Sequence, residues 1–334
     1  MTKKLINNAG NVIDDMLAGI VAAHPGEVRL APDSPRSLIS AAAPRPGKVG
    51  IVIGGGSGHE PGFLGYVGEG MADAAAVGNP FAAPGPEPIL AATRAVHGGA
   101  GVLYVIGNYT GDVMNFEMAA ELAGLEGIET RTVVATDDVA SAPLASAERR
   151  RGVAGAIFVF KAAGAAADLG YDLESVASAA LLANARVRTM GVALEPCSLP
   201  ATLTPNFTLG ADEIELGIGI HGEPGVERGP MRPADDVADA MFERVLAELD
   251  PAPGSEVAVL VNGMGATPLM ELYVVARRVL ERLEGRDLIV HRTLVGNFLT
   301  ALEMAGCSIS VLTLNEELKH LLDHPARPVL LGNF

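Results

Sequence analysis

Val49-Gly50-Ile51-Val52-Ile53-Gly54-Gly55-Gly56-Ser57-Gly58-His59-Glu60-Pro61 is the stretch that decides the fold class. It begins as a short apolar run and ends abruptly in glycines. An apolar run bounded by residues that break regular structure is typical of a strand buried on both faces of a parallel sheet. We therefore expect a strand over residues 49–53 and a glycine turn at its carboxyl end.

The same pattern recurs along the chain. Residues 102–106 are apolar, Gly107-Asn108-Tyr109-Thr110-Gly111-Asp112 interrupts them, and a helical pattern follows. Repetition of strand, glycine turn and helix predicts an α/β sheet. Ligands of such sheets gather at the carboxyl ends of the strands, which is where both glycine turns fall.

The remaining segments extend this expectation. After about residue 185 the strand patterns alternate, which implies a sheet with one covered face. We place a domain boundary there, with domains at 1–185 and 186–334. Other expected strands are 132–135, 157–160, 189–194, 213–220, 256–261, 288–293 and 308–314; helices are expected at 10–24, 268–283 and 297–305, and irregular structure at 25–48.

Composition excludes several classes of protein. A net charge of −16 argues against a nucleic-acid partner, because binding phosphates needs a concentrated basic face. One basic run, Arg149-Arg150-Arg151, is interpreted as a solvated loop, with a docking patch for an acidic partner as the alternative. Two cysteines cannot build a disulfide framework, and no cluster has the spacing of metal ligands.

The chain also lacks membrane signals. Its first residues have no continuous apolar stretch typical of a signal peptide, and no window reaches the roughly 18 uninterrupted apolar residues of a spanning helix. We expect a soluble cytoplasmic protein.

Two residues of the glycine segments have competing interpretations. His59 follows a loop that is neither a Walker A loop, since it lacks Lys, nor a dinucleotide fingerprint. Loop chemistry alone divides His59 evenly between a structural and a functional role. Asp112 stands where a helix is expected to begin, which favours a helix N-cap. The alternative is a carboxylate that accepts a hydrogen bond from a substrate hydroxyl.

His221 lies in a third segment, Gly217-Ile218-Gly219-Ile220-His221-Gly222-Glu223-Pro224-Gly225. Glycines and a proline enclose it, so nothing nearby supplies the bulk of a hydrophobic core. We expect its side chain to face a cleft or solvent. A neutral imidazole nitrogen is a competent nucleophile toward a carbonyl carbon, and a reference pKa of about 6.5 leaves most of it neutral at pH 7.

Several long motifs in one order resemble the substrate-binding (K) subunit family of dihydroxyacetone kinases, over nearly the whole chain. They are GGGSGHEPG, NYTGDVMNFE, MGVALEPCSLP, ELGIGIHGEPG, NGMGATPLMELY and VGNFLTALEMAGCSISVL. The resemblance implies an α/β/α three-layer domain with a mostly parallel sheet, a two-layer α/β domain with a mixed sheet, and homodimers.

The resemblance also implies residue roles. His221 matches the family histidine that forms a hemiaminal with the ketone carbonyl. His59 and Asp112 match the groups that bind and activate the hydroxyl. The glycine turn, Gly56, Ser57 and Gly58, matches the segment that holds the substrate.

A kinase of the glycerone type, in glycerol metabolism, is the activity that the resemblance implies. No cofactor is expected in this chain, because in the family ATP or ADP with magnesium sits on a separate L subunit or domain. The expected partners are that L subunit and, as an alternative source of phosphate, a phosphohistidine relay protein.

Two departures bear on the substrate. The family commonly has Lys before NYTGD, where this chain has Gly107, and often has Ala-His-Ala-Gly where this chain has Gly62-Phe63-Leu64-Gly65. Loss of a cation and a polar group makes a related ketose such as erythrulose an alternative substrate. A sensor or co-activator on the same fold is the alternative function.

Overall fold

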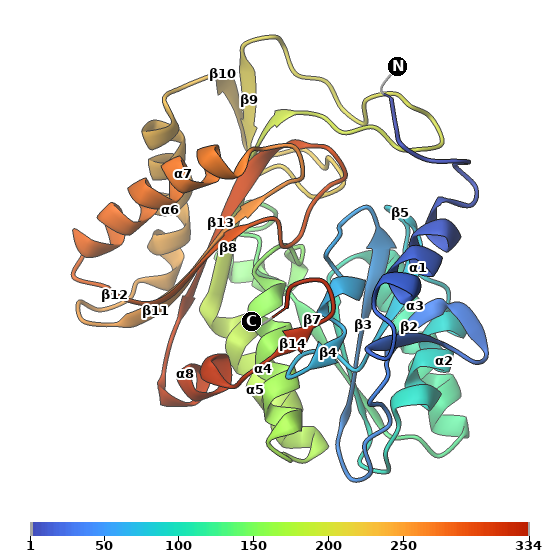
Figure 1. Cartoon of the computed structure of the whole chain (residues 1–334). Coiled ribbons are helices and arrows are strands. Elements are labelled where there is room, and N and C mark those ends of the chain that lie inside the picture. The colour runs from blue at the N-terminus through green and yellow to red at the C-terminus, as the bar shows by residue number, and fades with distance from the viewer. Residues whose placement is uncertain (1–2, 333–334) are drawn as a thin grey trace. The chain divides into compact units, whose positions relative to one another are not determined.

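The computed structural model describes residues 3–332 (Figure 1). The chain divides into two compact units, each taken here by itself. The first unit holds Lys4–Ala135, Phe158–Ala183 and the residues from Leu318 onward, and the second holds Thr136–Ile157 and Asn184–Glu317. The junction between Ala183 and Asn184 lies beside the expected boundary at 185.

Residues 136–157 belong to the second unit although they precede that boundary. Backbone hydrogen bonds attach them to its first strand: Thr189 N donates to Asp137 O at 2.8 Å, and Val139 N donates to Thr189 O at 3.0 Å. The units are therefore interleaved along the chain rather than consecutive.

The first unit has a six-stranded sheet in the order β1-β2-β5-β3-β6-β7. β5, β3, β6 and β7 pair in parallel, while β1 and β2 add an antiparallel edge. α2 and α3 cover one face and α4 and α5 the other (Figure 1), so the expected three-layer domain with a mostly parallel sheet is confirmed. The strands are β1 Val28–Ala31, β2 Ser34–Ser40, β3 Gly50–Ser57, β5 Ala74–Pro80, β6 Val102–Gly107 and β7 Thr130–Ala135, with a small pair of β4 Gly68–Glu69 and β14 Arg327–Pro328; the helices are α1 Val12–Ala23, α2 Pro86–Val96, α3 Thr110–Leu125, α4 Ala156–Asp168, α5 Leu173–Arg186 and α8 Glu316–Asp323.

The second unit has a six-stranded sheet in the order β10-β9-β8-β13-β11-β12, in which only β11 and β12 run parallel. α6 and α7 pack on this sheet through a shared aliphatic core. The expected two-layer domain with a mixed sheet is confirmed. The elements are β8 Val187–Glu195, β9 Glu213–Leu216, β10 Glu227–Pro230, α6 Ala234–Leu249, β11 Glu256–Gly263, α7 Leu269–Glu284, β12 Ile289–Gly296 and β13 Ala305–Thr313.

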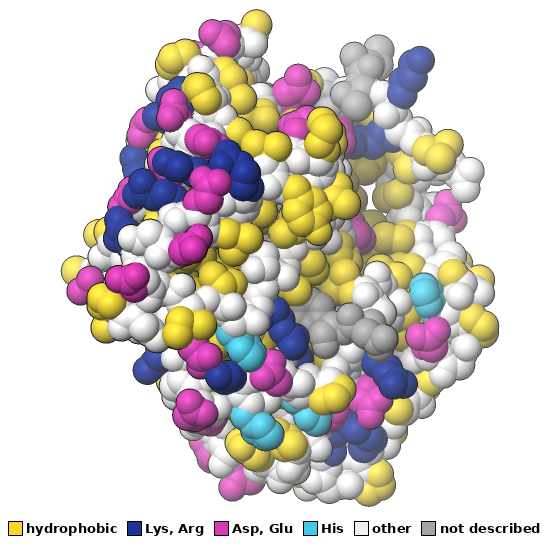
Figure 2. All heavy atoms as spheres, turned by 60° about the vertical axis from the view of Figure 1, so that its left-hand side comes forward, with side chains coloured by type: hydrophobic (Ala, Val, Ile, Leu, Met, Phe, Trp, Pro, Cys, Tyr) yellow, Lys and Arg dark blue, Asp and Glu magenta, His cyan; other side chains and the backbone are white. Residues whose placement is uncertain are grey.

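Charged side chains of both signs alternate over α6 and α7 (Figure 2). Arg278 donates two hydrogen bonds to Asp239 at 2.6 and 2.9 Å, and Arg282 and Arg286 both pair with Glu243. Carboxylates of α6 therefore neutralise these arginines, so these two helices present no concentrated basic face.

Three expectations of secondary structure were wrong. Residues 25–48 contain β1 and β2, because the apolar pair Leu38 and Ile39, both 0% exposed, outweighs the prolines and serines around it. Residues 157–160 lie in α4, which is buried almost all round; a short apolar run does not separate a buried helix from a buried strand. Residues 297–305 form turns up to the start of β13, because the Asn262 side chain binds the backbone of Phe298 and Leu299.

The basic run is not a solvated loop either. Arg149 is exposed, but Arg150 is 0% exposed and donates to both carboxylate oxygens of Glu248 at 2.6 and 2.7 Å. Arg151 pairs with the buried Asp138. Two of the three arginines therefore form ion pairs inside the second unit instead of facing solvent.

No helix among residues 3–332 combines the length and the apolar content that crossing a membrane requires.

Candidate active site

β3 continues through Gly54, Gly55 and Gly56 as far as Ser57, so these glycines are part of the strand and not of the turn that follows it. A Cβ atom on Gly54 would lie 2.6 Å from the carbonyl oxygen of Ala76, and one on Gly56 would lie 2.7 Å from the amide nitrogen of Ala82. Both distances are too short for any side chain. Glycine is required because β5 and the loop after it approach the β3 backbone directly. The turn itself comes at Gly58, where φ is +97°.

His59 follows that turn and is 1% exposed. Its ring stacks on Phe81 with centroids 5.0 Å apart and meets the ring of Phe63 edge-on at 6.2 Å. The carboxylate of Glu60 accepts the amide of Gly58 at 3.0 Å, and burial raises the pKa of Glu60. The aromatic contacts hold the imidazole plane at the carboxyl end of β3.

Asp112 is not the N-cap of its helix, which corrects the favoured interpretation. Tyr109 occupies the cap position of α3, and Asp112 lies in the first turn with 7% exposure. A carboxylate in the first turn is favoured by the positive end of the helix dipole. The structure is thus compatible with the alternative role, binding of a substrate hydroxyl.

The loop after β5 connects the His59 and Asp112 segments within the first unit. Phe81 of this loop stacks on His59, and the side chain of Ala83 would lie 3.1 Å from a Cβ atom on Gly111. Asn115 donates to the carbonyl oxygen of Pro84 at 2.8 Å. Both segments follow neighbouring parallel strands, β3 and β6, so they meet at one edge of the sheet, where ligands of α/β proteins bind.

His221 lies in a turn of the second unit, after β9 ends at Leu216, earlier than expected. Gly217 has φ of +81°, a left-handed conformation that ends the strand. The His221 amide donates to Glu223 Oε2 at 2.9 Å, and Asn206 Nδ2 donates to the carbonyl oxygen of His221 at 2.9 Å. The side chain is 23% exposed, so His221 lies outside the core as the sequence predicts.

The ring of His221 is oriented by Glu223, whose Oε1 lies 2.9 Å from Nδ1. Burial opposes ionisation of Glu223, but the hydrogen bond and the charge of His221 prevail and lower the pKa of Glu223 to about 2. An ionised carboxylate only accepts hydrogen bonds, so Nδ1 must carry the proton. In the neutral imidazole the lone pair then lies on Nε2, which is the ring nitrogen that a nucleophilic role would use.

Sequence reasoning missed Glu223 as a functional residue. The signal was present in the spacing, because a carboxylate two residues after a histidine in a glycine turn can reach back to the ring. Gly222 makes that reversal possible: its φ is +87°, and a Cβ atom there would lie 2.5 Å from Asn206 Nδ2.

The two departures from the family pattern have different surroundings. Gly107 is the last residue of β6 and precedes the Asp112 segment. Phe63 packs inward, with its ring 2.2 Å from the position of a Cβ atom on Gly55 and 6.1 Å from the centroid of Phe160. Leu64 is buried as well. The Phe63-Leu64 pair is thus apolar packing beneath the glycine loop.

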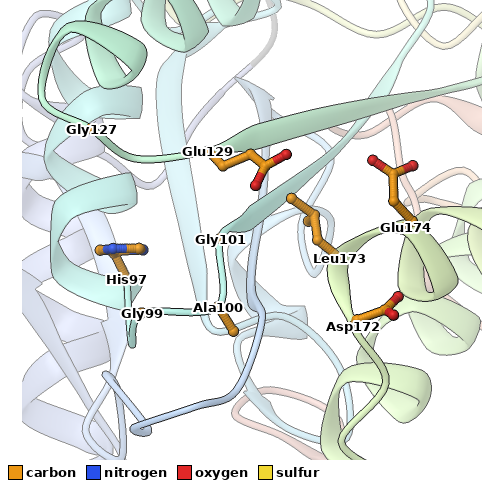
Figure 3. Close-up of a pocket in the computed structure, with 9 residues that line it drawn as sticks. All are labelled: His97, Gly99, Ala100, Gly101, Gly127, Glu129, Asp172, Leu173 and Glu174. Atoms are coloured by element: carbon orange, nitrogen blue, oxygen red, sulfur yellow. The ribbon is translucent and has the colours of Figure 1, made fainter.

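An open pocket of the first unit lies away from these residues (Figure 3). Gly101 and Glu129, which line it, precede β6 and β7, so it opens at the amino ends of the strands. His59 and Asp112 follow the carboxyl ends. Among residues 3–332, no three His, Cys, Asp or Glu side chains are grouped so as to hold a metal ion.

The fold and site define an α/β protein with a carboxylate-oriented histidine, and comparison with known proteins gives the family. Residues 18–329 match the Dak1 domain. The chain is 47% identical over 323 residues, 97% of each chain, to the dihydroxyacetone-binding subunit DhaK of PTS-dependent dihydroxyacetone kinase 2 from Listeria innocua. It is 45% identical to the D-erythrulose kinase of Mycolicibacterium smegmatis over 97% of this chain and 55% of that one.

Solved structures with a similar fold point to the same family. The dihydroxyacetone kinase operon co-activator DhaQ superposes with a TM-score of 0.87 at 34% identity, over 95% of this chain and 97% of that one. The dihydroxyacetone kinase of C. freundii in complex with AMP-PNP and Mg²⁺ gives 0.87 at 32% identity, over 96% of this chain and 59% of that one. The chain belongs to the Dak1 domain family, as its motifs predict.

Proposed function

We propose that this chain is the substrate-binding subunit of a dihydroxyacetone-type kinase, a phosphotransferase with an alcohol acceptor that acts together with a partner subunit. The observation that carries the proposal is the contact of His221 Nδ1 with Glu223 Oε1 at 2.9 Å, which makes Nε2, and not Nδ1, the ring nitrogen that would add to a ketone. Relatives of nearly the same length that are named dihydroxyacetone-binding subunits support it.

Covalent capture begins when the Nε2 lone pair of His221 adds to the ketone carbon. The carbonyl π electrons move to oxygen, and the ring gains positive charge that Glu223 stabilises. The Nδ1 proton is then lost toward Glu223, and the former carbonyl oxygen gains a proton. The sum is ketone plus imidazole N–H giving a hemiaminal with a hydroxyl. Glycerol has no carbonyl, so this step selects ketones over polyols of the same shape.

The terminal hydroxyl is bound and activated by His59 and Asp112, with Gly56, Ser57 and Gly58 holding the substrate. Fixing the acceptor supplies part of the roughly 7–11 kcal/mol available from positioning. An aspartate is a weak base, but phosphoryl transfer passes through a loose transition state in which alignment of the acceptor oxygen matters more than early deprotonation. The resemblance of the GGGSGHEPG and NYTGD segments to the family motifs supports these roles.

Nucleotide and magnesium belong to a separate partner subunit in this proposal. The C. freundii kinase was solved with AMP-PNP and Mg²⁺, and this chain spans 59% of it. The Listeria relative is named PTS-dependent, which supports a phosphohistidine relay as the ultimate donor in place of ATP. We further propose a cytoplasmic homodimer, as implied by the family.

Dihydroxyacetone is the first candidate substrate and erythrulose the second. The D-erythrulose kinase match, together with Gly107 and the packed Phe63-Leu64 pair, favours testing the four-carbon ketose beside the three-carbon one. A ketone-binding co-activator is the alternative function, supported by the likeness to DhaQ.

The test uses carbon-13-labelled dihydroxyacetone and erythrulose with the whole chain. We expect the carbonyl resonance to move to the tetrahedral region, with a matching mass increase in non-denaturing mass spectrometry, and we expect His221→Ala to abolish both. Full retention of the labelled ketone by His221→Ala would reject the hemiaminal. Adding the partner subunit and magnesium, with ATP in one arm and a phosphohistidine relay protein in the other, separates kinase from co-activator, because only a kinase yields phosphorylated ketose in either arm.

A further inference from the structure

Arg151 contacts the loop that carries His221, although it lies 70 residues earlier in the sequence. Its Nη2 donates to the carbonyl oxygen of Gly217 at 3.0 Å, where the loop leaves β9. A Cβ atom on Gly219 would lie 2.4 Å from Nη1 of Arg151 and 2.2 Å from Oε2 of Glu223. The guanidinium and the carboxylate that orients His221 thus crowd the same point over Gly219.

Asp138 holds the guanidinium in this place. Its Oδ2 accepts Arg151 Nε at 2.8 Å and lies 2.7 Å from Nη2, and the two side chains are 3% and 13% exposed. Asp138 is itself braced, because its Oδ1 accepts the amide of Ala140 at 3.0 Å. The amide of Asp138 donates to the carbonyl oxygen of Arg151 at 3.2 Å, which closes the segment between them into a loop.

The same loop packs on Gly217 from the side. A Cβ atom on Gly217 would lie 2.6 Å from the Cβ atom of Ala140. Ser141 Oγ donates to the carbonyl oxygen of Asp138 and accepts the amide of Arg151. Residues 138–151 therefore meet the histidine loop through one side-chain hydrogen bond and two close glycine contacts, all within the second unit.

We propose that Arg151, held by Asp138, is the positioning residue that fixes residues 217–223 and thereby the imidazole of His221. This inference rests on the proposed function for its effect on ketone capture. Stability of the buried ion pair alone does not require Nη2 of Arg151, which already lies against Asp138, to donate also to the carbonyl oxygen of Gly217, nor the guanidinium to crowd Gly219. Displacement of a reacting group by about 1 Å is enough to lower rates roughly a hundredfold.

The test compares Arg151→Gln, Asp138→Asn and Arg151→Lys, with Arg150→Gln as the matched control. Arg150 is a buried arginine of the same segment, but it binds Glu248 and Ala142 instead of the histidine loop. Two quantities are measured on the folded fraction: the equilibrium for hemiaminal formation with labelled dihydroxyacetone, and amide hydrogen exchange over residues 217–223.

We expect Arg151→Gln and Asp138→Asn to weaken adduct formation by about tenfold or more and to speed exchange in the loop. Arg151→Lys is expected to recover part of the adduct, while Arg150→Gln lowers the melting temperature and leaves adduct formation per folded molecule unchanged. Wild-type adduct formation and loop exchange in folded Arg151→Gln would overturn the inference. An absent adduct in the wild type would reject the ketone proposal instead, and loop exchange would still decide the role of Arg151.

Discussion

His221 and Glu223 together show how much chemistry two side chains gain from a turn between them. The sequence predicted that His221 lies outside the core, and the structure confirms this, while the nucleophilic role of His221 stays a prediction. The carboxylate partner was not foreseen, because its contact depends on the left-handed Gly222 and on Asn206, which lies 15 residues earlier in the chain. The spacing of His221 and Glu223 permits their contact, but the contact of Asn206 with this turn, across 15 residues, leaves no pattern in the sequence.

Replacing Glu223 by Gln should weaken hemiaminal formation by roughly tenfold, because the amide neither fixes the Nδ1 tautomer by its charge nor stabilises the charged ring. The carbon-13 assay of the ketone measures this effect. His221→Ala in the same assay defines complete loss, and equal adduct formation by Glu223→Gln would contradict the orienting role.

Glu223 should also give the protein a specific pH dependence. Its pKa is about 2 in the folded chain, below the value of an unfolded glutamate, so ionised Glu223 binds fewer protons in the folded state. Its stabilising contribution is present above about pH 4.5 and disappears as the pH falls toward 2. The difference in free energy of unfolding between wild type and Glu223→Gln should therefore shrink over that interval, as measured by denaturant titration. A difference that stays constant would contradict the pKa assignment.

Asp112→Asn should lower turnover with the partner subunit by about a hundredfold or more while changing ketone affinity by less than about threefold. The carboxylate lies in the first turn of α3 but is not its cap, so the change should leave the helix intact. Steady-state kinetics and the carbon-13 assay separate the two effects. A loss confined to affinity would assign Asp112 to binding alone.

At the scale of elements, the repeated pattern of strand, glycine segment and helix predicted the first unit, and the structure contains β3, β6 and α3 where that pattern falls. The pattern could not locate α4, whose apolar and small residues are buried on nearly every side and so lack a polar face. It also could not show why β3 contains consecutive glycines. That reason lies in the approach of another strand and loop, which only the tertiary structure contains.

Two glycine substitutions in the first unit test whether the close approach of β5 and its following loop requires glycine in β3. Gly56→Ala should destabilise the protein by about 1–3 kcal/mol, because its side chain meets the backbone of Phe81 and Ala82, which cannot rotate away. Gly19→Ala should stabilise it by about 0.5–1 kcal/mol, because nothing lies within 4 Å of the added atom in α1. Chemical denaturation measures both. An equal change in the free energy of unfolding for Gly56→Ala and Gly19→Ala would show that β3 tolerates a side chain at residue 56.

At the scale of the whole molecule, the two units are interleaved. Residues 136–157 contribute to the second unit before the first is complete, and residues from Leu318 onward return to the first. Lys161 donates to the carbonyl oxygen of Leu321 at 2.7 Å, and β14 pairs with β4, so the returning segment is bonded into the first unit. A single cut at residue 185, the simplest division of the sequence, separates these partners.

Fragments 1–185 and 186–334 should therefore fail to fold when expressed separately and should form a soluble complex when expressed together. Each fragment contains a segment whose partners are in the other, including Arg150 with Glu248 and Lys161 with Leu321. Proteolysis resistance and circular dichroism of the fragments measure the outcome. A cooperative unfolding transition in either isolated fragment would show that its sheet suffices alone.

The return of the chain to its first unit has a consequence for biosynthesis. The buried Lys161 amine and the short strand β4 acquire their C-terminal partners only when residues 321–328 have been translated. The first unit to be started is thus the last to be finished, because the small β4–β14 sheet and the partner of Lys161 form after its six-stranded sheet has been translated. The second unit, whose final strand ends at Thr313, is complete slightly sooner. In nascent chains stalled just past that strand, the sheet of the second unit should resist protease, while the segment around β4, which still lacks β14, should be cleaved.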